Sequence, residues 1–255
     1  MDKDEILFKP IYETGRGFYI TFGILTVILL WALAMYINQV MVGLGPTGMN
    51  QPVTWGFYIV NFVFFIGISH AGTLISAILR LSKAEWRRPI TRMAEVITAI
   101  VLMIGGLHPI LDLGRPDRMM NLLESGRLQS PLLWDVTSIT AYFTASTVYL
   151  YLPMIPDIAR IRDRGGKLTW LYTFMAWGWQ GTEYQQKVLN RAINILMVMV
   201  IPIAISVHTV ISYIFSMTLQ PGWHSTIFGP YFVVGAIFSG IAALMIVMMA
   251  FRKVY

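Results

Sequence analysis

The sequence predicts an all-α fold, a polytopic membrane bundle of about six transmembrane helices. Hydrophobic residues make up 56% of the 255 residues and charged residues only 13%, whereas soluble domains carry about 25% charged residues. The apolar residues are gathered in six runs, and each approaches or exceeds the roughly 20 residues that a helix needs to cross a bilayer. We expect the spans at about 17–42, 54–80, 91–113, 132–154, 192–217 and 227–251.

Charged and turn-forming residues separate these spans. Residues 1–16 hold four acidic and three basic side chains and no cleavage-site pattern. We therefore expect a cytoplasmic segment there, followed by an uncleaved first helix that anchors the chain. The turn-rich stretch 43–53 ends the first helix. Pro89 and Pro131 occupy the positions at which the third and fourth helices should begin.

Lysine and arginine are distributed unequally between the two sides of the predicted bundle. The termini and the connections 80–92 and 155–191 carry 16 of the 19 basic residues, and the remaining 3 all lie in 114–131. Basic loops favour the cytoplasm, so the sequence predicts a multi-pass protein of the inner (plasma) membrane with a cytoplasmic N-terminus. The same bias accounts for the net charge of +6 without a nucleic-acid partner.

Residues 155–191 are the longest predicted connection. Within it, 168–179 is short, aromatic and flanked by basic residues, which favours an amphipathic helix on the cytoplasmic surface over a seventh span. We divide the chain into a segment over 1–16, a transmembrane region over 17–217, and an external loop with the sixth helix over 218–255. In a longer subunit, that last part would begin a second bundle.

The chain contains no cysteine. This absence excludes cysteine-ligated iron–sulfur clusters, covalently attached c-type haem and disulfides in this chain. If the protein takes part in electron transfer, a partner protein must therefore carry the cysteine-bound redox centres.

Ionisable side chains within the predicted spans form two groups at different depths. Such residues are costly in a bilayer and usually face the protein interior. His70 and Glu95 are expected toward the cytoplasmic side, and a larger group toward the external face. The external group consists of His108, Asp112, Arg115, Asp117 and Asp135, with His208 deeper and His224 on the loop above.

Both a structural and a functional interpretation are open for these residues. The structural alternatives are an interhelical hydrogen bond from His70, an ion pair of Glu95 with Arg92 or Arg88, a salt-bridge knot of Asp112, Arg115 and Asp117, and helix-dipole stabilisation of Asp135. Because His108 and Asp135 are predicted at one depth, they favour a functional pocket. Quinol oxidation requires a proton acceptor such as His, a buried carboxylate and apolar walls. We predict His108 and Asp135 as the catalytic pair, and Glu95 and His70 as a proton path.

Several sequence strings resemble the NrfD/PsrC family of membrane subunits. These are Gly67-Ile-Ser-His-Ala-Gly-Thr73, His108-Pro-Ile-Leu-Asp-Leu-Gly-Arg-Pro-Asp-Arg118, Ser130-Pro-Leu-Leu-Trp-Asp135, Ser206-Val-His-Thr209 and Pro221-Gly-Trp-His-Ser-Thr-Ile-Phe-Gly-Pro230. The last string most closely resembles the membrane subunits of alternative complex III, and the similarity runs from about residue 10 to the end of the sequence.

The resemblance implies a quinol-interacting membrane subunit without haem, iron–sulfur cluster or metal site, and a core formed by its second to fifth helices. It places His108 and Asp135 in the quinol site, and we add Asp112, Arg115, Trp134 and His208 as binding residues. Menaquinol is the expected substrate. The implied partners are c-type cytochrome subunits, an external iron–sulfur or molybdopterin-type subunit and a second NrfD-like membrane subunit.

Two departures and two other functions stay open at this point. Ile214 stands where the family pattern has an acid, and the chain is shorter than such subunits usually are. One alternative function is a haem b anchor, with His108 and His208 as axial ligands. The other is a transporter, which the short likeness between 68–73 and 205–209 suggests.

Overall fold

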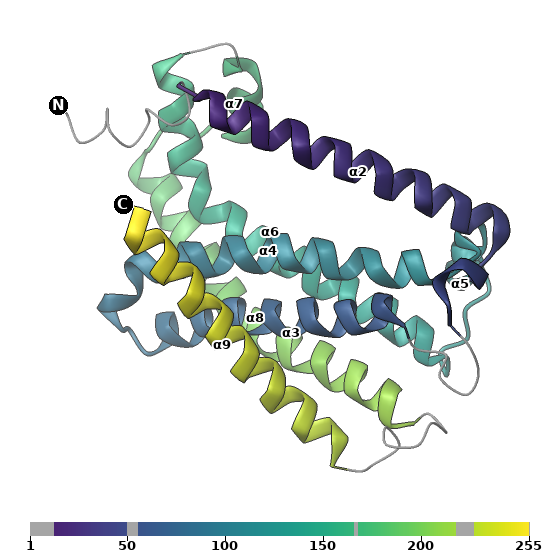
Figure 1. Cartoon of the computed structure of the whole chain (residues 1–255). Helices are drawn as coiled ribbons and strands as arrows, with labels where there is room; N and C mark the ends of the chain where they lie inside the picture. The colour runs from purple at the N-terminus through teal and green to yellow at the C-terminus, as the bar shows by residue number, and fades with distance from the viewer. Residues whose placement is uncertain (1–12, 50–55, 166–167, 218–226, 255) are drawn as a thin grey trace.

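The computed structural model describes residues 13–49, 56–165, 168–217 and 227–254, and over these ranges it contains helices and no strand. Figure 1 shows long helices that run side by side, joined by short ones at their ends. The elements are α2 (Arg16–Val42), η1 (Gly45–Thr47), α3 (Phe57–Leu81), η2 (Glu85–Arg87), α4 (Arg88–Asp112), η3 (Pro116–Arg118), α5 (Met119–Glu124), α6 (Pro131–Arg164), α7 (Thr169–Met175), α8 (Glu183–Ser216) and α9 (Phe228–Val254).

The core of the protein is a four-helix bundle of α3, α4, α6 and α8, the predicted second to fifth helices (Figure 1). Around this ring α3 packs on α4, α4 on α6, α6 on α8 and α8 on α3. Apolar side chains from all four helices are buried between them, among them Ile66, Leu102, Tyr142 and Val207. The prediction of an all-α bundle with this four-helix core is confirmed.

Five of the long helices are apolar enough to span a membrane by length and composition, namely α2, α3, α4, α8 and α9. Helix α6 is longer than most of them but does not meet this hydropathy criterion. Its segment from Ile139 to Leu152 nevertheless packs along Leu189 to Ile211 of α8. We therefore treat α6 as the sixth spanning helix, whose polar residues are tolerated because it packs against other helices rather than standing alone in lipid. The end at which α4 ends and α6 begins is called the external end below, and the opposite end the cytoplasmic end, following the charge distribution.

The connection predicted over 155–191 is mostly helical, because α6 and α8 extend into it from both sides. Helix α6 continues to Arg164 and ends at Gly165, whose φ of +74° suits glycine. Helix α8 begins at Glu183 behind a capping box, in which Thr182 and Gln185 satisfy each other's backbone N–H groups. The apolar pattern marks only where a helix leaves the membrane, and a charged helix can extend beyond that point.

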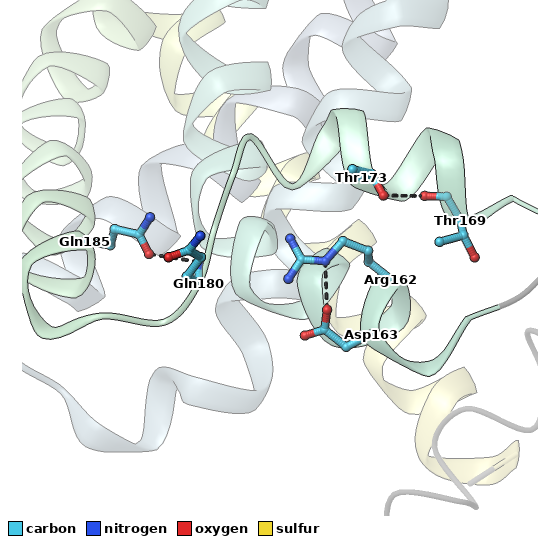
Figure 2. Close-up of polar contacts among 6 residues, drawn as sticks. All are labelled: Arg162, Asp163, Thr169, Thr173, Gln180 and Gln185. Atoms are coloured by element: carbon cyan, nitrogen blue, oxygen red, sulfur yellow. Dashed lines mark hydrogen bonds and ion pairs between the residues drawn. The ribbon is translucent and has the colours of Figure 1, made fainter.

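The short helix α7 does exist within the predicted amphipathic segment, but its inner face packs on protein. Ala176, directly after α7, is fully buried against Ile158 and Ala159 of α6. Figure 2 shows this region, with the Thr173 hydroxyl bonded to the Thr169 carbonyl and Arg162 paired with Asp163. The segment is therefore fixed to the cytoplasmic end of α6.

Helix α2 stands apart from the bundle (Figure 1). Of its 27 residues only Gln39 is buried. The Gln39 amide donates to the Leu111 carbonyl of α4 at 2.8 Å and accepts from the Tyr58 hydroxyl of α3 at 2.6 Å. These two hydrogen bonds join the external end of α2 to the bundle, and most of its remaining surface is available to lipid or to another subunit.

Helix α9 packs on the opposite flank, against α3 and α8 (Figure 1). Phe232 and Ala236 of α9 are buried. Phe232 belongs to the same cluster as Val207 and Phe215 of α8. The sixth helix thus packs on the first bundle, and whether it also begins a second bundle stays a prediction.

Candidate functional site

The predicted catalytic residues lie at the external end of the bundle, on two helices that contact each other. Gly106 of α4 faces Ile139 of α6, with 3.9 Å between the ideal Cβ position of the glycine and the Ile139 Cγ2 atom. The two helices run in opposite directions, so one turn further out Asp135 of α6 lies level with the α4 turn between His108 and Asp112. The matched depth that the sequence suggested is therefore present in the fold.

His108 is held in one orientation. Its Nδ1 atom lies 2.8 Å from the Ile104 carbonyl oxygen, and its ring packs on Phe65 with 5.7 Å between the ring centroids. A carbonyl oxygen can only accept, so Nδ1 carries the proton in this contact. In the neutral ring Nε2 is then the free acceptor, which is the state that a general base requires.

The two acids beside His108 each have an unsatisfied oxygen. Asp112 Oδ1 and Asp135 Oδ1 are buried atoms without a hydrogen-bond partner within the described parts of the chain. Such atoms cost free energy and usually mark a functional group or a bound polar molecule. Across the described residues no three His, Cys, Asp or Glu side chains come close enough to hold a metal ion.

Arg115 and Trp134 lie at the edge of this region. Arg115 forms a bidentate pair with Asp117, with an Nη2–Oδ2 distance of 2.9 Å, and both side chains are mostly exposed. The hydrogen bonds from Arg115 hold the pKa of the Asp117 carboxyl below its usual value. Asp112 is not bonded within this pair, so the predicted three-residue knot is only partly formed. The Trp134 indole donates to the Leu128 carbonyl and fixes the loop before α6, and His224 lies outside the described residues.

A cavity of about 1270 Å³ lies between α2, η1, the start of α3 and the external half of α4. Leu107 and Leu111 of α4 line it, and they are the sequence neighbours of His108 and Asp112. Its other walls come from α2, η1 and the start of α3, and include Trp31, Met35, Gln39 and Tyr58. The lining is predominantly apolar, with a few polar groups near Gln39.

The structure places His208 beside His70, in the interior of the bundle, and both residues are fully buried. Their rings are in contact, with 4.0 Å between centroids. His208 Nδ1 lies 3.0 Å from the Ala204 carbonyl oxygen, and Nε2 lies 3.0 Å from that of Ile66. Because both nitrogens face carbonyl oxygens and the two rings touch, this arrangement provides no axial pair for a haem from His108 and His208 or from His70 and His208.

Glu95 lies at the cytoplasmic end of the same interior. Only 2% of the residue is exposed. Its Oε1 atom accepts from the Ser76 hydroxyl at 2.5 Å and lies 3.7 Å from Arg80 Nη2. The structural alternative that pairs Glu95 with Arg92 is not the arrangement found, since Arg92 forms an ion pair with Asp157 of α6. The side chain of Arg88 is not described.

Hydroxyl groups lie between the level of Glu95 and that of the histidine pair. Ser69, Thr73 and Ser76 follow one face of α3, and all three are buried. Thr73 lies 3.4 Å from Ser146, and the Tyr142 hydroxyl donates to the Ser69 carbonyl at 2.9 Å. These residues were not predicted from the sequence as part of the site. Their spacing of three and four residues within the span 54–80 was the signal that could have revealed them.

The fold and the polar interior define this chain as a polytopic helical membrane protein with ionisable groups enclosed in a four-helix core. Residues 45–254 match the family described as "Polysulphide reductase, NrfD". The chain therefore belongs to the NrfD family.

Three curated relatives agree with this assignment. The chain is 28% identical over 252 residues to a protein from Halobacterium salinarum assigned as a dimethyl sulfoxide reductase membrane subunit, covering 96% of this chain and 55% of the relative. It is 25% identical over 253 residues to a selenate reductase subunit from Mesobacillus selenatarsenatis, covering 96% and 57%. It is 22% identical over 218 residues to the Hdr-like menaquinol oxidoreductase integral membrane subunit of Archaeoglobus fulgidus, covering 84% and 46%. The chain thus spans about half the length of these relatives.

Proposed function

We propose that this chain is the quinol-binding membrane subunit of a respiratory oxidoreductase, and that the quinol ring binds at the external end beside His108 and Asp135. The observation that carries the proposal is the pair of buried, unpartnered carboxylate oxygens of Asp112 and Asp135 at the level of His108. The membrane subunits named as relatives belong to reductases and a menaquinol oxidoreductase, which supports a redox role and menaquinol as the substrate.

His108 and Asp135 supply what quinol oxidation requires of a protein. The reaction removes two protons and two electrons from the ring. His108 Nε2 is the free acceptor for one hydroxyl proton, because Nδ1 is committed to the Ile104 carbonyl. Asp135 provides a second acceptor on the facing helix. The electrons pass to a partner, since this chain has no cysteine to hold an iron–sulfur cluster.

The cavity along α2 suits the apolar tail of such a molecule. Leu107 and Leu111 line it, one residue away from His108 and Asp112 respectively. A ring at the external cluster and a tail between α2 and α4 would therefore occupy adjoining spaces. Trp134 and Arg115 lie at the rim, so any part they play is in holding the loop rather than in proton transfer.

The enclosed polar residues support a proton path on the cytoplasmic side. Glu95, the hydroxyls of Ser76, Thr73 and Ser146, and the pair His70 and His208 lie at successive levels of the core. We assign His208 to this path rather than to the quinol site, because it contacts His70. A connection between His70 and the external cluster would extend this path across the whole membrane.

The proposed partner binds the external end. The loop between α4 and α6 exposes Arg118, Arg127, Met120, Leu123 and Leu128, a mixture of basic and apolar side chains suited to a protein interface. An iron–sulfur or molybdopterin-type subunit is the partner that the redox role requires. We further propose c-type cytochromes and a second NrfD-like subunit as partners, as in alternative complex III. We also propose that the N-terminus of this chain lies in the cytoplasm.

The test is quinol turnover by the purified complex with Asp135→Asn or His108→Gln. Each variant should reduce turnover at least tenfold, because general acid–base groups contribute about 10²–10⁴-fold, while the complex stays assembled. Asp117→Asn is the matched control, since this external acid is exposed and bonded to Arg115. Wild-type turnover in both site variants, or an equal loss in the control, would remove the quinol site from this cluster.

A further inference from the structure

The turn between α7 and α8 holds a tryptophan in a backbone conformation that side chains rarely adopt. Trp177 has a φ of +50°, and only one other described residue besides glycine, Lys83, has a positive φ. Gly178 and Gly181 follow with φ values of +70° and +76°. A left-handed bulky residue is strained, and such strain is retained where the surrounding structure fixes it.

Buried contacts and hydrogen bonds fix this turn on both sides of Trp177. Ala176 is fully buried against α6. Beyond the tryptophan, Gln185 of α8 donates to the Gly178 carbonyl at 3.1 Å and accepts from the Gln180 N–H at 2.9 Å. Figure 2 shows the second of these contacts between the turn and α8. The Trp177 side chain itself is 78% exposed, so packing against the protein does not explain its presence.

Two more exposed aromatic residues precede Trp177, on the outer side of α7. Trp170 and Phe174 are 70% and 77% exposed, and they lie four residues apart on one helix face. Tyr172 and Met175 pack on α6 instead. The seven-residue helix thus carries apolar side chains on both faces, and only the inner set is covered by the described protein.

The beginning of α8 adds positive charge at the same end of the bundle. Tyr184, Lys187 and Arg191 are exposed and share one face of α8, which continues into the exposed apolar residues Ile195 and Val198. Neither basic side chain has an ion-pair partner within the described ranges. With a rise of about 1.5 Å per residue, the two charges lie within roughly 12 Å of the apolar stripe, at the depth of lipid headgroups.

We propose that Lys187 and Arg191, with Tyr184 on the same face of α8, bind the headgroup of an anionic phospholipid, and that the exposed aromatic residues of α7 and Trp177 anchor this end of the bundle in the headgroup layer. Basic side chains directly beyond a lipid-facing stripe match a lipid phosphate in charge and in depth. Tryptophan and tyrosine favour this interfacial layer, where the ring meets apolar chains and its polar edge meets water. The proposed lipid site is independent of the proposed quinol chemistry.

Lipid retention by the purified complex tests this proposal. The complex is reconstituted with phosphatidylglycerol and phosphatidylcholine in equal amounts, extracted in mild detergent, and the retained lipids are counted by native mass spectrometry. The wild type should retain phosphatidylglycerol preferentially. The double variant Lys187→Gln/Arg191→Gln should lower this preference by about fivefold for each charge removed. The charge-conserving double variant Lys187→Arg/Arg191→Lys keeps both positive charges at the same positions and should keep the preference.

A second variant separates binding from folding. Trp177→Gly removes the strain at a positive φ and little buried area, so the unfolding temperature should hold or rise while phosphatidylglycerol retention falls. Equal retention of the two lipids by the wild type would overturn the proposal. An equal loss in the charge-conserving control would do so too, as would displacement of the bound lipid by millimolar inorganic phosphate, which would indicate a site for free anions.

Discussion

The imidazole rings of His70 and His208 lie in contact at the centre of the bundle, with 4.0 Å between their centroids. Their surroundings differ. His208 faces two backbone carbonyls, whereas neither nitrogen of His70 has a hydrogen-bond partner among the described residues. A ring between two carbonyl oxygens can donate from both nitrogens only when it is protonated. The nitrogens of His208 thus contact the backbones of both α8 and α3, whereas those of His70 contact neither.

This asymmetry predicts different effects of removing each ring. His208→Phe should lower the free energy of unfolding by about 1–2 kcal/mol, because the interhelical hydrogen bond to the Ile66 carbonyl is lost. His70→Phe should change it by less than about 1 kcal/mol, since no hydrogen bond is lost. Thermal unfolding of the purified complex measures both. A larger loss for His70→Phe would show that His70 has a structural partner.

The effects on stability of substituting Glu95 and Arg80 should be coupled. Glu95→Leu leaves the largely buried Arg80 without its counter-charge, and should cost about 3 kcal/mol of stability. The double variant Glu95→Leu/Arg80→Met should recover part of that loss, because no unpaired charge remains. Unfolding of the two single variants and the double variant gives the coupling free energy. Additive losses would mean that the 3.7 Å contact carries no interaction.

Gln39 should control how firmly α2 is held. Gln39→Leu removes the hydrogen bonds to the Leu111 carbonyl and the Tyr58 hydroxyl, which join α2 to α4 and α3. We expect a broader distribution of distances between spin labels on α2 and α4 in nanodiscs. Asn38→Leu is the matched control, because Asn38 is exposed. Identical distributions for Gln39→Leu and the wild type would show that other contacts fix α2.

Gly72 should be intolerant of even a methyl group. An alanine side chain there would clash with the Thr98 hydroxyl and the Ala94 carbonyl of α4, where α3 and α4 approach most closely among the glycines described. We expect Gly72→Ala to destabilise the bundle by about 1–3 kcal/mol. Gly235→Ala in α9 is the control, since no atom lies within 4 Å of the added group. Equal unfolding temperatures for both variants would contradict this packing.

Much of the fold follows from the sequence. The five helices that are apolar enough to span a membrane lie where the apolar runs predicted them, and Pro131 begins α6 as expected. At the cytoplasmic end, helices α6 and α8 extend about ten residues beyond the predicted spans 132–154 and 192–217. Hydropathy reports the thickness of the bilayer, while a helix continues until a residue such as Gly165 or a capping box such as that of Thr182 ends it.

The sequence by itself determined the helical membrane class and the depth shared by His108 and Asp135, because these depend on composition and on counting residues along a helix. The four-helix core was an expectation from the family resemblance. Only the tertiary structure decided which buried groups meet. It showed that His208 contacts His70 and that Glu95 contacts Ser76 and Arg80. It also showed that Leu107 lines a cavity. The physical reason is that depth is a property of one helix, whereas contact depends on how each helix is rotated about its axis. That rotation is set by packing among helices that are distant in the sequence.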